Sequence, residues 1–281
     1  MPRLGVLGWP VAHSRSPAIH NAALAALQMD GWRYQRLPVP PALFAETVRA
    51  LGAAGFLGAN VTIPHKQAAL ALATDCSAAA REIGAANTLT FAPDGTIAAE
   101  NTDAPGLISA LGSMIDMPAH PRALVLGAGG SARAAVWALR EAGASDVAVW
   151  NRTPERAETL ARELGVRSVR TPEAADLLVN CTSVGLEAAS GVERSATQHE
   201  ALNQLGLTFD QVGKYSYVVD LVYRSGSTQL LAAATSHGAG TVDGLEVLVA
   251  QGALSFQLWT GRQPPLDVMR RAARAESTAT A

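Results

Sequence analysis

Cysteine and histidine are scarce in this chain, and neither forms a cluster. The 281 residues include two cysteines, Cys76 and Cys181, and six scattered histidines. Structural zinc sites need several such residues at close spacing, so we expect no metal. Two thiols this far apart in the sequence are typical of free cysteines in a reducing compartment, which predicts a cytoplasmic protein.

Long apolar runs and a strong charge imbalance are also missing. No stretch of 18 apolar residues is free of charged residues or helix breakers, which predicts no transmembrane helix. The apolar part of residues 1–8 is too short for a secretory signal and instead predicts a strand. A net charge of −2 and a pI near 6.3 give no reason to propose nucleic acid as a partner. We therefore expect no membrane or nucleic-acid partner, and the sequence leaves monomer and homodimer both open.

Lysine is the rarest charged residue, with Lys66 and Lys214 against twenty arginines. Lys66 ends the run Gly58-Ala59-Asn60-Val61-Thr62-Ile63-Pro64-His65-Lys66, so a buried strand is expected to deliver its amine to a surface or a cleft. An amine can lose its proton near neutral pH when it is desolvated or lies beside another cation, whereas a guanidinium cannot. Lys66 is therefore a candidate for proton transfer, with an exposed residue at a strand end as the alternative.

Apolar residues, in contrast, are abundant. Hydrophobic residues make up 48% of the chain and charged residues 16%, and the length suggests two domains. The first hundred residues alternate strand and helix patterns, which predicts a mostly parallel α/β sheet covered by helices. Pro17 lies in the first turn of an expected helix with Ser16 as its N-cap, and residues 93–95 mark a hairpin turn. We expect strands at residues 4–7, 32–39, 56–63, 87–91 and 96–99, and helices at residues 17–27 and 41–51.

A second alternation of strands and helices begins near Asp103. Its spacing predicts a Rossmann-like, doubly wound parallel sheet. The polar segment 187–214 is expected to contain a loop and a short helix. We expect strands at residues 123–126, 146–150, 176–181 and 217–222, and helices up to residue 142 and at residues 154–164, 244–259 and 265–275.

A glycine-rich turn between a strand and a helix predicts a dinucleotide site. Gly127, Gly129 and Ala132 fit the pattern G-x-G-x-x-G/A. The first glycine permits a tight turn, the second lets a pyrophosphate approach the backbone, and the small third residue lets the helix pack close to the strand. The start of the helix then offers unpaired N–H groups to the phosphates.

The end of the next expected strand indicates which dinucleotide binds. NAD-binding folds place an acidic residue there to accept from the ribose hydroxyls, but this chain has Asn151-Arg152-Thr153, followed by Arg156. Two arginines one helical turn apart suit a 2′-phosphate, which favours NADP. The alternative is that both arginines are merely solvated residues of the first turn.

Further polar residues follow the strands of the first half. Ser14 and Ser16 lie just before a helix start and can donate to an anion such as a carboxylate. Thr62 and Lys66 follow the third expected strand, and Asp103 stands at another strand-to-helix junction, where an N-cap is the alternative role. Ligands of open α/β sheets bind beyond the carboxyl ends of strands, so these residues are expected to converge on a substrate.

Together these segments resemble the shikimate dehydrogenase family over almost the whole chain. The most specific are the lysine motif at residues 60–66 and the closing Gln251-Gly252-Ala253, with Phe256 and Trp259 after it. The remaining segments follow in the order of the family: His13-Ser14-Arg15-Ser16-Pro17 with His20-Asn21, Gly84-Ala85-Ala86-Asn87-Thr88-Leu89, Asn101-Thr102-Asp103, Gly127 to Ala132, Asn151-Arg152-Thr153 with Arg156, and Asp220-Leu221-Val222-Tyr223.

The resemblance implies reversible, NADPH-dependent reduction of 3-dehydroshikimate to shikimate, a step of chorismate and aromatic amino acid biosynthesis. It implies Lys66 and Asp103 as the catalytic pair. The implied substrate-binding residues are Ser14, Ser16, Thr62, Lys66, Asn87, Asp103, Tyr223 and Gln251. The implied NADP-binding residues are Gly127, Ala128, Gly129, Gly130, Ser131, Ala132, Asn151, Arg152, Thr153, Arg156, Thr182, Leu221 and Gly244.

The resemblance also implies a division of the chain. Residues 1–102 and 245–281 are expected to form a substrate (catalytic) domain and residues 103–244 an NADP-binding Rossmann domain, with a cleft between them. One departure is visible, because the family usually carries a proline-containing loop after Tyr223 and this chain has Arg224-Ser225-Gly226-Ser227-Thr228-Gln229. The placement of Tyr223 is accordingly the least constrained of the implied roles.

Other functions remain to be weighed. A quinate/shikimate dehydrogenase, or a relative acting on an amino analogue, is the closest alternative. A non-catalytic, NADPH-responsive regulator on the same scaffold would be expected to lose Lys66 and Asp103, both of which this chain keeps. A folate-linked dehydrogenase of related fold leaves the loop with Ser14 and Ser16 unexplained.

Overall fold

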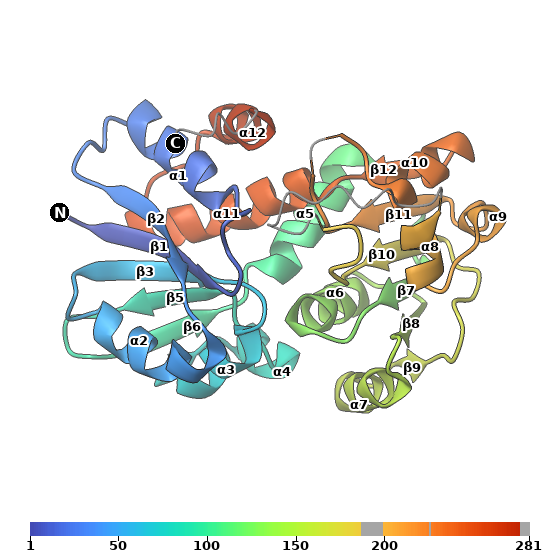
Figure 1. Cartoon of the computed structure of the whole chain (residues 1–281), viewed down its shortest axis with the longest axis horizontal. Coiled ribbons are helices and arrows are strands. Elements are labelled where there is room, and N and C mark those ends of the chain that lie inside the picture. Colours follow the sequence, from blue (N-terminus) through green and yellow to red (C-terminus); the bar gives the residue numbers. More distant parts are fainter. Residues whose placement is uncertain (187–198, 225, 276–281) are drawn as a thin grey trace. The chain divides into compact units, whose positions relative to one another are not determined.

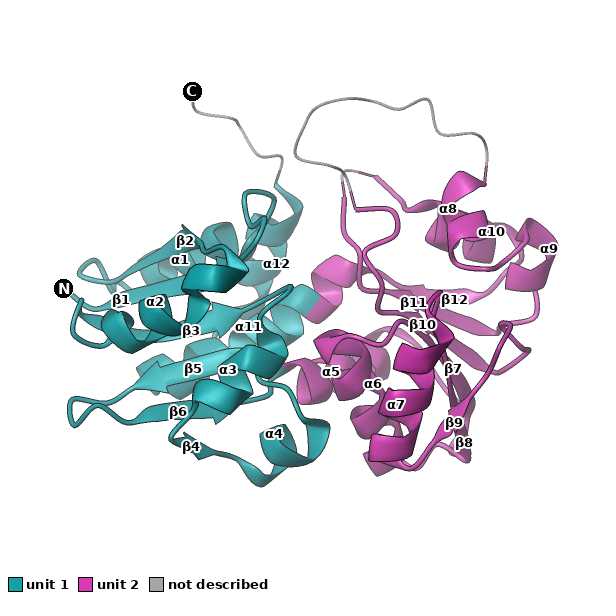
Figure 2. Ribbon diagram, turned by 60° about the horizontal axis from the view of Figure 1, so that its bottom comes forward, with its two compact units in different colours: residues 1–102, 248–281 teal, residues 103–247 magenta. Residues whose placement is uncertain are grey.

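The computed structural model describes residues 1–186, 199–224 and 226–275. The chain forms two compact units, which Figure 2 colours separately. Unit 1 contains Met1–Thr102 and Leu248–Ala281, and unit 2 contains Asp103–Val247. The family resemblance implied that the second domain ends at residue 244, whereas the second unit extends to residue 247, inside a long helix.

Unit 1 is built on a six-stranded mixed sheet with the order β2-β1-β3-β5-β6-β4. The pairs β1–β2, β1–β3 and β4–β6 are parallel, while β3–β5 and β5–β6 are antiparallel. The antiparallel pair β5–β6 is the expected hairpin. The strands are β1 (Arg3–Gly8), β2 (Arg33–Pro38), β3 (Phe56–Val61), β4 (Asp75–Cys76), β5 (Thr88–Phe91) and β6 (Ile97–Glu100).

Apolar side chains cover both faces of this sheet. Leu4 and Val6 of β1 join a cluster with Tyr34 and Trp259, whereas Leu7 joins the larger cluster on the other face. This alternation follows the two-residue repeat of a strand. Helices α1 and α12 pack against each other (Figure 1). The helices of the unit are α1 (Ser16–Ala26), α2 (Phe44–Leu51), α3 (Lys66–Leu72), α4 (Ala78–Ile83), α12 (Leu266–Arg274) and the part of α11 (Gly244–Thr260) from residue 248.

Unit 2 has a six-stranded sheet in which every strand pair is parallel, in the order β12-β11-β10-β7-β8-β9. This sheet has the topology of dinucleotide-binding folds, with the strand order reversing between β10 and β7. The strands are β7 (Arg122–Leu126), β8 (Asp146–Trp150), β9 (Arg167–Ser168), β10 (Leu177–Asn180), β11 (Tyr217–Asp220) and β12 (Gly240–Val242). The helices are α5 (Asp103–Met114), α6 (Gly130–Glu141), α7 (Pro154–Leu164), α8 (Glu200–Gln204), α9 (Phe209–Val212) and α10 (Gln229–Ser236).

The predicted fold class is confirmed. Each strand and helix expected from the sequence is present within a few residues, and β8 and α7 have the predicted bounds. The sequence predicted no bounds for α5 and α10, nor for the short elements α3, α4, β4, β9 and β12, which have weak patterns of their own. The expected short helix in the segment 187–214 corresponds to α8 and α9, and residues 187–198 lie outside the described part.

One local prediction is wrong. Ser16 is the first residue of α1, and the N-cap is Arg15, which makes no side-chain capping bond. The Ser16 N–H instead donates to Oγ of Ser14 at 3.3 Å. The turn before the helix is therefore closed by Ser14, and the hydroxyl of Ser16 is not used as a cap.

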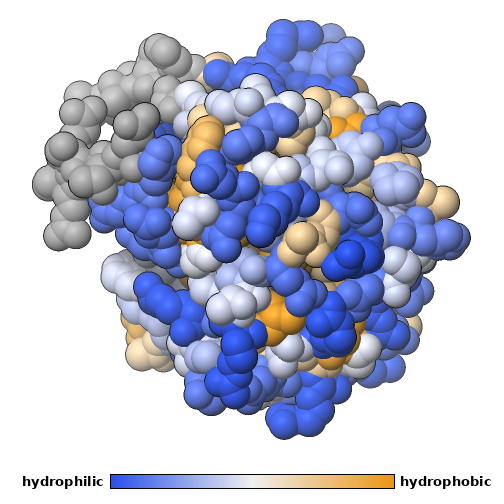
Figure 3. Space-filling view, turned by 90° about the vertical axis from the view of Figure 1, so that its right-hand side faces the viewer, coloured by the Kyte–Doolittle hydropathy of each residue, from blue (hydrophilic) through white to orange (hydrophobic). Residues whose placement is uncertain are grey.

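None of the helices in the described residues combines the length and apolar character needed to cross a membrane. On the face shown in Figure 3, hydrophilic residues predominate and apolar residues form small separate groups.

Candidate active site

The loop between β1 and α1 holds two buried serines. Ser14 and Ser16 are 4% and 5% exposed. Arg36 of β2 fixes this loop from the side, because its Nε and Nη2 donate to the carbonyl oxygen of Ser14 at 3.1 and 2.8 Å. Ser16 has no hydrogen-bond partner for its hydroxyl among the described residues. The loop thus combines an available hydroxyl with a nearby guanidinium, an arrangement that can bind a carboxylate.

Asn87, Thr102 and Gln251 form a buried hydrogen-bonded group in unit 1. Nδ2 of Asn87 donates to Oγ1 of Thr102 at 3.0 Å and to Oε1 of Gln251 at 3.1 Å. Oδ1 of Asn87 accepts from the Thr102 N–H at 2.7 Å. Nε2 of Gln251 donates to the carbonyl oxygen of Leu248 at 2.8 Å, which orients its amide. Two of the expected substrate-binding residues, Asn87 and Gln251, are therefore brought together.

A second layer of polar side chains supports this group. Nδ2 of Asn60 donates to the carbonyl oxygen of Asn87 and to Oγ1 of Thr88, at 3.3 and 3.2 Å. Oδ1 of Asn60 accepts from the Tyr34 hydroxyl at 2.7 Å. No role for Asn60, Thr88 or Thr102 was predicted from the sequence. A buried amide in the middle of an apolar strand was the available signal for Asn60, because such a group needs partners.

Lys66 is buried at 9% exposure and is the first residue of α3. It is thus not the exposed residue that the alternative assignment required. The preceding His65 anchors the turn, since its ring nitrogen Nε2 lies 2.8 Å from the carbonyl oxygen of Val39 and its ring stacks on Phe44 at 4.2 Å. Thr62 follows β3 directly, and its N–H donates to the carbonyl oxygen of Leu7 at 2.9 Å. The sharp turn after β3 therefore fixes the backbone at both Thr62 and Lys66.

The carboxyl edge of the unit 2 sheet begins with the glycine-rich turn. Gly127 has a φ of +112°, and a Cβ at this position would lie 3.2 Å from the backbone of Cys181 and 3.3 Å from the Thr182 methyl. Gly129 is the N-cap of α6, and no described atom lies within 4 Å of where its Cβ would stand. The backbone at Gly129, just before the first turn of α6, thus faces open space, as close approach of a phosphate requires. Ala132 is fully buried, in keeping with close helix packing.

The residues after β8 match a site for a phosphorylated ribose. Arg152 and Arg156 are both exposed, and neither has an ion-pair partner within the described part of the chain. Nδ2 of Asn151 donates to the carbonyl oxygen of Thr153 at 2.9 Å, which shapes the turn into α7. Two such guanidinium groups, with no acidic residue at the strand end, suit the 2′-phosphate of NADP.

The loops after β10, β11 and β12 complete this edge. Thr182 lies against Gly127, as described above. Gly244 leaves no room for a side chain, because its Cβ would stand 2.5 Å from the carbonyl oxygen of Leu221 and 2.9 Å from that of Val222. Tyr223 follows in the same loop and is half-buried. The expected residues Thr182, Leu221 and Gly244 therefore share one edge of the sheet with the glycine-rich turn.

Asp103 is the first residue of α5 and is partly buried. It is an acidic residue in the first turn of the helix, where a negative charge is favourable. Because α5 begins at Asp103 itself, Asp103 is not the N-cap that the sequence analysis offered as its alternative role.

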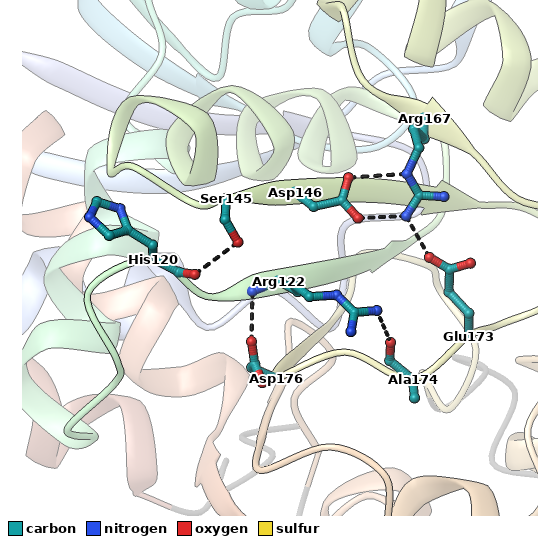
Figure 4. A network of polar contacts seen from close by, with 8 residues as sticks. All are labelled: His120, Arg122, Ser145, Asp146, Arg167, Glu173, Ala174 and Asp176. Carbon is teal, nitrogen blue, oxygen red and sulfur yellow. Dashed lines mark hydrogen bonds and ion pairs between the residues drawn. The ribbon is translucent and has the colours of Figure 1, made fainter.

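A prominent charged network lies at the opposite edge of the unit 2 sheet (Figure 4). Arg167 contacts Asp146 at 2.5 Å and Glu173 at 2.6 Å. The Arg122 N–H donates to Asp176 at 2.8 Å. These residues stand at the amino ends of β7 and β8 and beside β9 and β10. Ligands of such sheets bind at the carboxyl ends, so this network is a clamp between strands.

No group of three or more histidine, cysteine, aspartate or glutamate side chains within the described ranges could hold a metal ion. Cys76 and Cys181 form no disulfide, and both are partly buried.

Three family models match the chain. They are described as the shikimate dehydrogenase substrate binding domain, over residues 6–89, shikimate/quinate 5-dehydrogenase, over residues 113–202, and the shikimate 5′-dehydrogenase C-terminal domain, over residues 244–274. A shikimate dehydrogenase (NADP(+)) of Thermus thermophilus is 45% identical over 98% of this chain and 98% of its own. That of Symbiobacterium thermophilum is 41% identical over 97% of this chain and 93% of its own.

Solved structures give the same result. A shikimate 5-dehydrogenase from Thermus thermophilus, in complex with NADP(H) and shikimate, has a TM-score of 0.84 and 42% identity, covering 98% of this chain and 99% of that chain. A shikimate dehydrogenase in complex with NADP+ also has a TM-score of 0.84, with 31% identity over 97% of this chain and 94% of that chain. With this similarity over nearly its full length, the chain belongs to the shikimate dehydrogenase family.

Proposed function

We propose that this chain catalyses the reversible, NADPH-dependent reduction of 3-dehydroshikimate to shikimate, a step of chorismate and aromatic amino acid biosynthesis. The observation that carries the proposal is the match over 98% of the chain to an enzyme solved with both NADP(H) and shikimate. In this proposal unit 1 binds the substrate and unit 2 binds NADP. The family models support this division, since the substrate binding domain model matches within unit 1.

The proposed substrate residues suit a carboxylated ring with several hydroxyls. Ser14 and Ser16 bind the carboxylate, helped by the charge of Arg36 behind the loop. Thr62, Asn87, Gln251 and Tyr223 bind hydroxyls. The buried amides of Asn87 and Gln251 are already oriented by their partners, which lowers the entropy cost of binding.

The proposed cofactor residues fit NADP. Gly127, Ala128, Gly129, Gly130, Ser131 and Ala132 bind the pyrophosphate, and Asn151, Arg152, Thr153 and Arg156 bind the ribose 2′-phosphate. Thr182, Leu221 and Gly244 line the nicotinamide end. The open space at Gly129 and the exposure of both arginines support this assignment. When bound, NADPH supplies the hydride that reduces the ketone.

Lys66 and Asp103 are proposed to carry out the proton transfer of the reaction. Addition of a hydride to a ketone carbon leaves an alkoxide that needs one proton. The Lys66 ammonium polarises the carbonyl and donates that proton, and the Asp103 carboxylate orients the amine and a substrate hydroxyl. In the reverse direction the Lys66 amine accepts the proton from the alcohol. The mechanism requires both side chains to reach the same substrate.

Quinate is the second candidate substrate, because one matched family model covers both shikimate and quinate dehydrogenases. A spectrophotometric assay with shikimate or quinate as hydride donor, and NADP or NAD as acceptor, tests the proposal. We expect reduction of NADP by shikimate at the highest kcat/KM of the four combinations. Faster turnover of quinate, or of NAD, would reassign the enzyme, and no turnover with any pair would contradict the proposal.

We further propose a cytoplasmic location and a monomer or homodimer as the working form. A biosynthetic reduction needs a supply of NADPH, and this need supports a cytoplasmic location. Fractionation of the native organism and size-exclusion chromatography with light scattering test these two points.

A further inference from the structure

Asp220 is a buried carboxylate to which the proposed mechanism gives no role. It is the last residue of β11 and is 1% exposed. Its Oδ2 accepts from the Thr228 hydroxyl at 2.7 Å, and its Oδ1 accepts from Nδ2 of Asn180 at 2.8 Å and from the Val222 N–H at 3.1 Å. Burial raises the pKa of Asp220 to about 6, while these three donors favour the charged form.

The contacts of Asn180 extend the network to the neighbouring loop. Asn180 is the last residue of β10 and is fully buried. Its Oδ1 accepts from the N–H of Thr182 at 3.0 Å and from the hydroxyl of Thr182 at 2.8 Å. The hydroxyl of Thr182 accepts in turn from the Val184 N–H at 3.1 Å. One carboxylate thus connects the loop after β10 with the loop after β11.

Both loops carry residues of the proposed cofactor and substrate sites. Thr182 lies against Gly127, and the carbonyl oxygen of Leu221 lies against Gly244. Along the chain, Tyr223 lies between Val222 and Thr228. The Val222 N–H and the Thr228 hydroxyl both donate to the Asp220 carboxylate. The two contacts therefore close the loop that contains Tyr223.

Thr228 makes a second hydrogen bond that fixes its side chain. It is the N-cap of α10, and its Oγ1 accepts from the Leu231 N–H at 3.2 Å. The hydroxyl consequently joins the start of α10 to the end of β11. This chain has no proline between Tyr223 and Gln229, so no pyrrolidine ring restricts the loop there. The two ends of the loop are instead held by the Asp220 carboxylate.

From this geometry we propose that Asp220 is a positioning residue, which holds Tyr223 through Thr228 and Val222 and holds Thr182 through Asn180. The role rests on the proposed function, because Tyr223 and Thr182 are assigned to the site there. Asp220 touches neither substrate nor cofactor in this scheme. Its contribution is to fix two loops relative to the glycine-rich turn before either ligand arrives, which is a form of preorganisation.

The test is a double-mutant cycle between Thr228 and Tyr223. Thr228→Val removes the hydroxyl at nearly constant volume, and Tyr223→Phe removes the group that the loop presents. We expect Thr228→Val to lower kcat/KM for shikimate by about five- to twentyfold in the natural protein and by less than about twofold in Tyr223→Phe. Thr228→Ser, which keeps the hydroxyl, is expected to retain most of the activity. Asp220→Asn is a second variant, and when Tyr223 is phenylalanine it should keep only the part of its effect that acts through Asn180 and Thr182.

Thr208→Val is the matched control. Thr208 is also a threonine N-cap in unit 2, but it caps α9 through the Gln211 N–H and is exposed. Its loss should also lower Tm, though by less than Thr228→Val because no buried carboxylate loses a donor, and it should leave kcat/KM unchanged. The proposal is overturned if Thr228→Val costs the same in both backgrounds. It is also overturned if Thr208→Val lowers kcat/KM as much as Thr228→Val does.

Amide hydrogen exchange tests the positioning role of Asp220 independently of the proposed enzymatic activity. Peptides that cover residues 217–232 should exchange faster in Thr228→Val than in the natural protein, with no change in peptides from unit 1. Unchanged exchange overturns the positioning role even in an active enzyme. Faster exchange in a protein that turns over neither shikimate nor quinate supports the loop contacts and contradicts the proposed function alone.

Discussion

Nδ2 of Asn87 lies 3.1 Å from Oε1 of Gln251, and this contact joins residues 164 positions apart in the chain. Both side chains are buried, at 2% and 7% exposure. Each amide is therefore held in one orientation before a ligand binds, and the loss of either leaves a buried polar group with one hydrogen-bond partner fewer. Such a group costs roughly 1–3 kcal/mol.

Gln251→Ala is expected to raise KM for shikimate by about 10- to 100-fold, because the variant loses a proposed substrate contact and leaves the Asn87 amide short of one acceptor. KM for NADP should change little. Gln257→Ala on the same helix is the control, since Gln257 is exposed. Steady-state kinetics with each substrate varied in turn measures the effect. An unchanged KM for shikimate would remove Gln251 from the substrate site.

The two lysines provide a direct test of the chemistry. Lys66→Ala is expected to lower kcat by about 10²–10⁴, the usual size of general acid–base effects, with a smaller effect on KM. Lys214→Ala is the control, because Lys214 is the other lysine of the chain and is exposed. If kcat stayed the same in Lys66→Ala, Lys66 could not be the proton donor.

The two arginines after β8 are expected to decide the choice between NADP and NAD. Replacing Arg152 and Arg156 together by alanine removes the proposed partners of the 2′-phosphate. KM for NADP should rise by about 10- to 100-fold while KM for NAD changes little, since charge-assisted hydrogen bonds are the strong ones. Arg162→Ala, further along α7 and exposed, is the control. An equal rise in KM for both dinucleotides would mean that the arginines do not bind the 2′-phosphate.

The sequence predicted those parts of the fold that depend on local patterns. The bounds of β8 and α7 follow from an apolar strand, a proline near the helix start and a glycine after its end, all of which lie within one short segment. The glycine-rich turn was recognisable for the same reason. The family resemblance then supplied the candidate residues of both units.

The polar network of unit 1 could not be predicted in this way. Asn60, Thr88 and Ser255 come from three different elements, and they become neighbours only after the sheet and α11 have formed. The capping role predicted for Ser16 was wrong for a related reason. Both Ser14 and Ser16 have the chemistry of a cap, and only the backbone geometry shows that Ser14 accepts the N–H of Ser16.

The clamp at the amino ends of the unit 2 strands should affect stability and not activity. Arg167 and its partners Asp146 and Glu173 are between one-third and one-half exposed, so the cluster is worth about 1 kcal/mol or less. Arg167→Ala is expected to lower Tm by about 2 °C with kcat/KM within about twofold. The hydrogen bond from Arg167 lowers the pKa of Asp146, so the difference in Tm should disappear in acid, as Asp146 becomes protonated. Differential scanning calorimetry measures the change in Tm at each pH, and a large loss of activity would contradict the structural role.

His20 predicts a further pH dependence of stability. It is fully buried, stacks on Tyr34 at 4.2 Å, and lies 5.8 Å from the ring of Trp259. Neither ring nitrogen has a hydrogen-bond partner among the described residues. Burial therefore lowers the pKa of His20 from 6.5 to about 3, and the imidazole stays neutral in the folded protein.

The sign of the effect follows from proton uptake. The unfolded chain protonates this histidine below pH 6.5, whereas the folded protein does so only near pH 3, so the free energy of unfolding falls as the pH drops between these values. From pH 7 to pH 5 the loss due to His20 is about 2 kcal/mol. His20→Phe keeps an aromatic ring without a titratable group, and its stability should fall by about 2 kcal/mol less over that range. Urea unfolding of both proteins at the two pH values measures the difference. His13 and His65, whose pKa values burial also lowers, are present in both proteins, so their contributions cancel. Equal losses in the two proteins would show that the His20 site accepts a proton without unfolding.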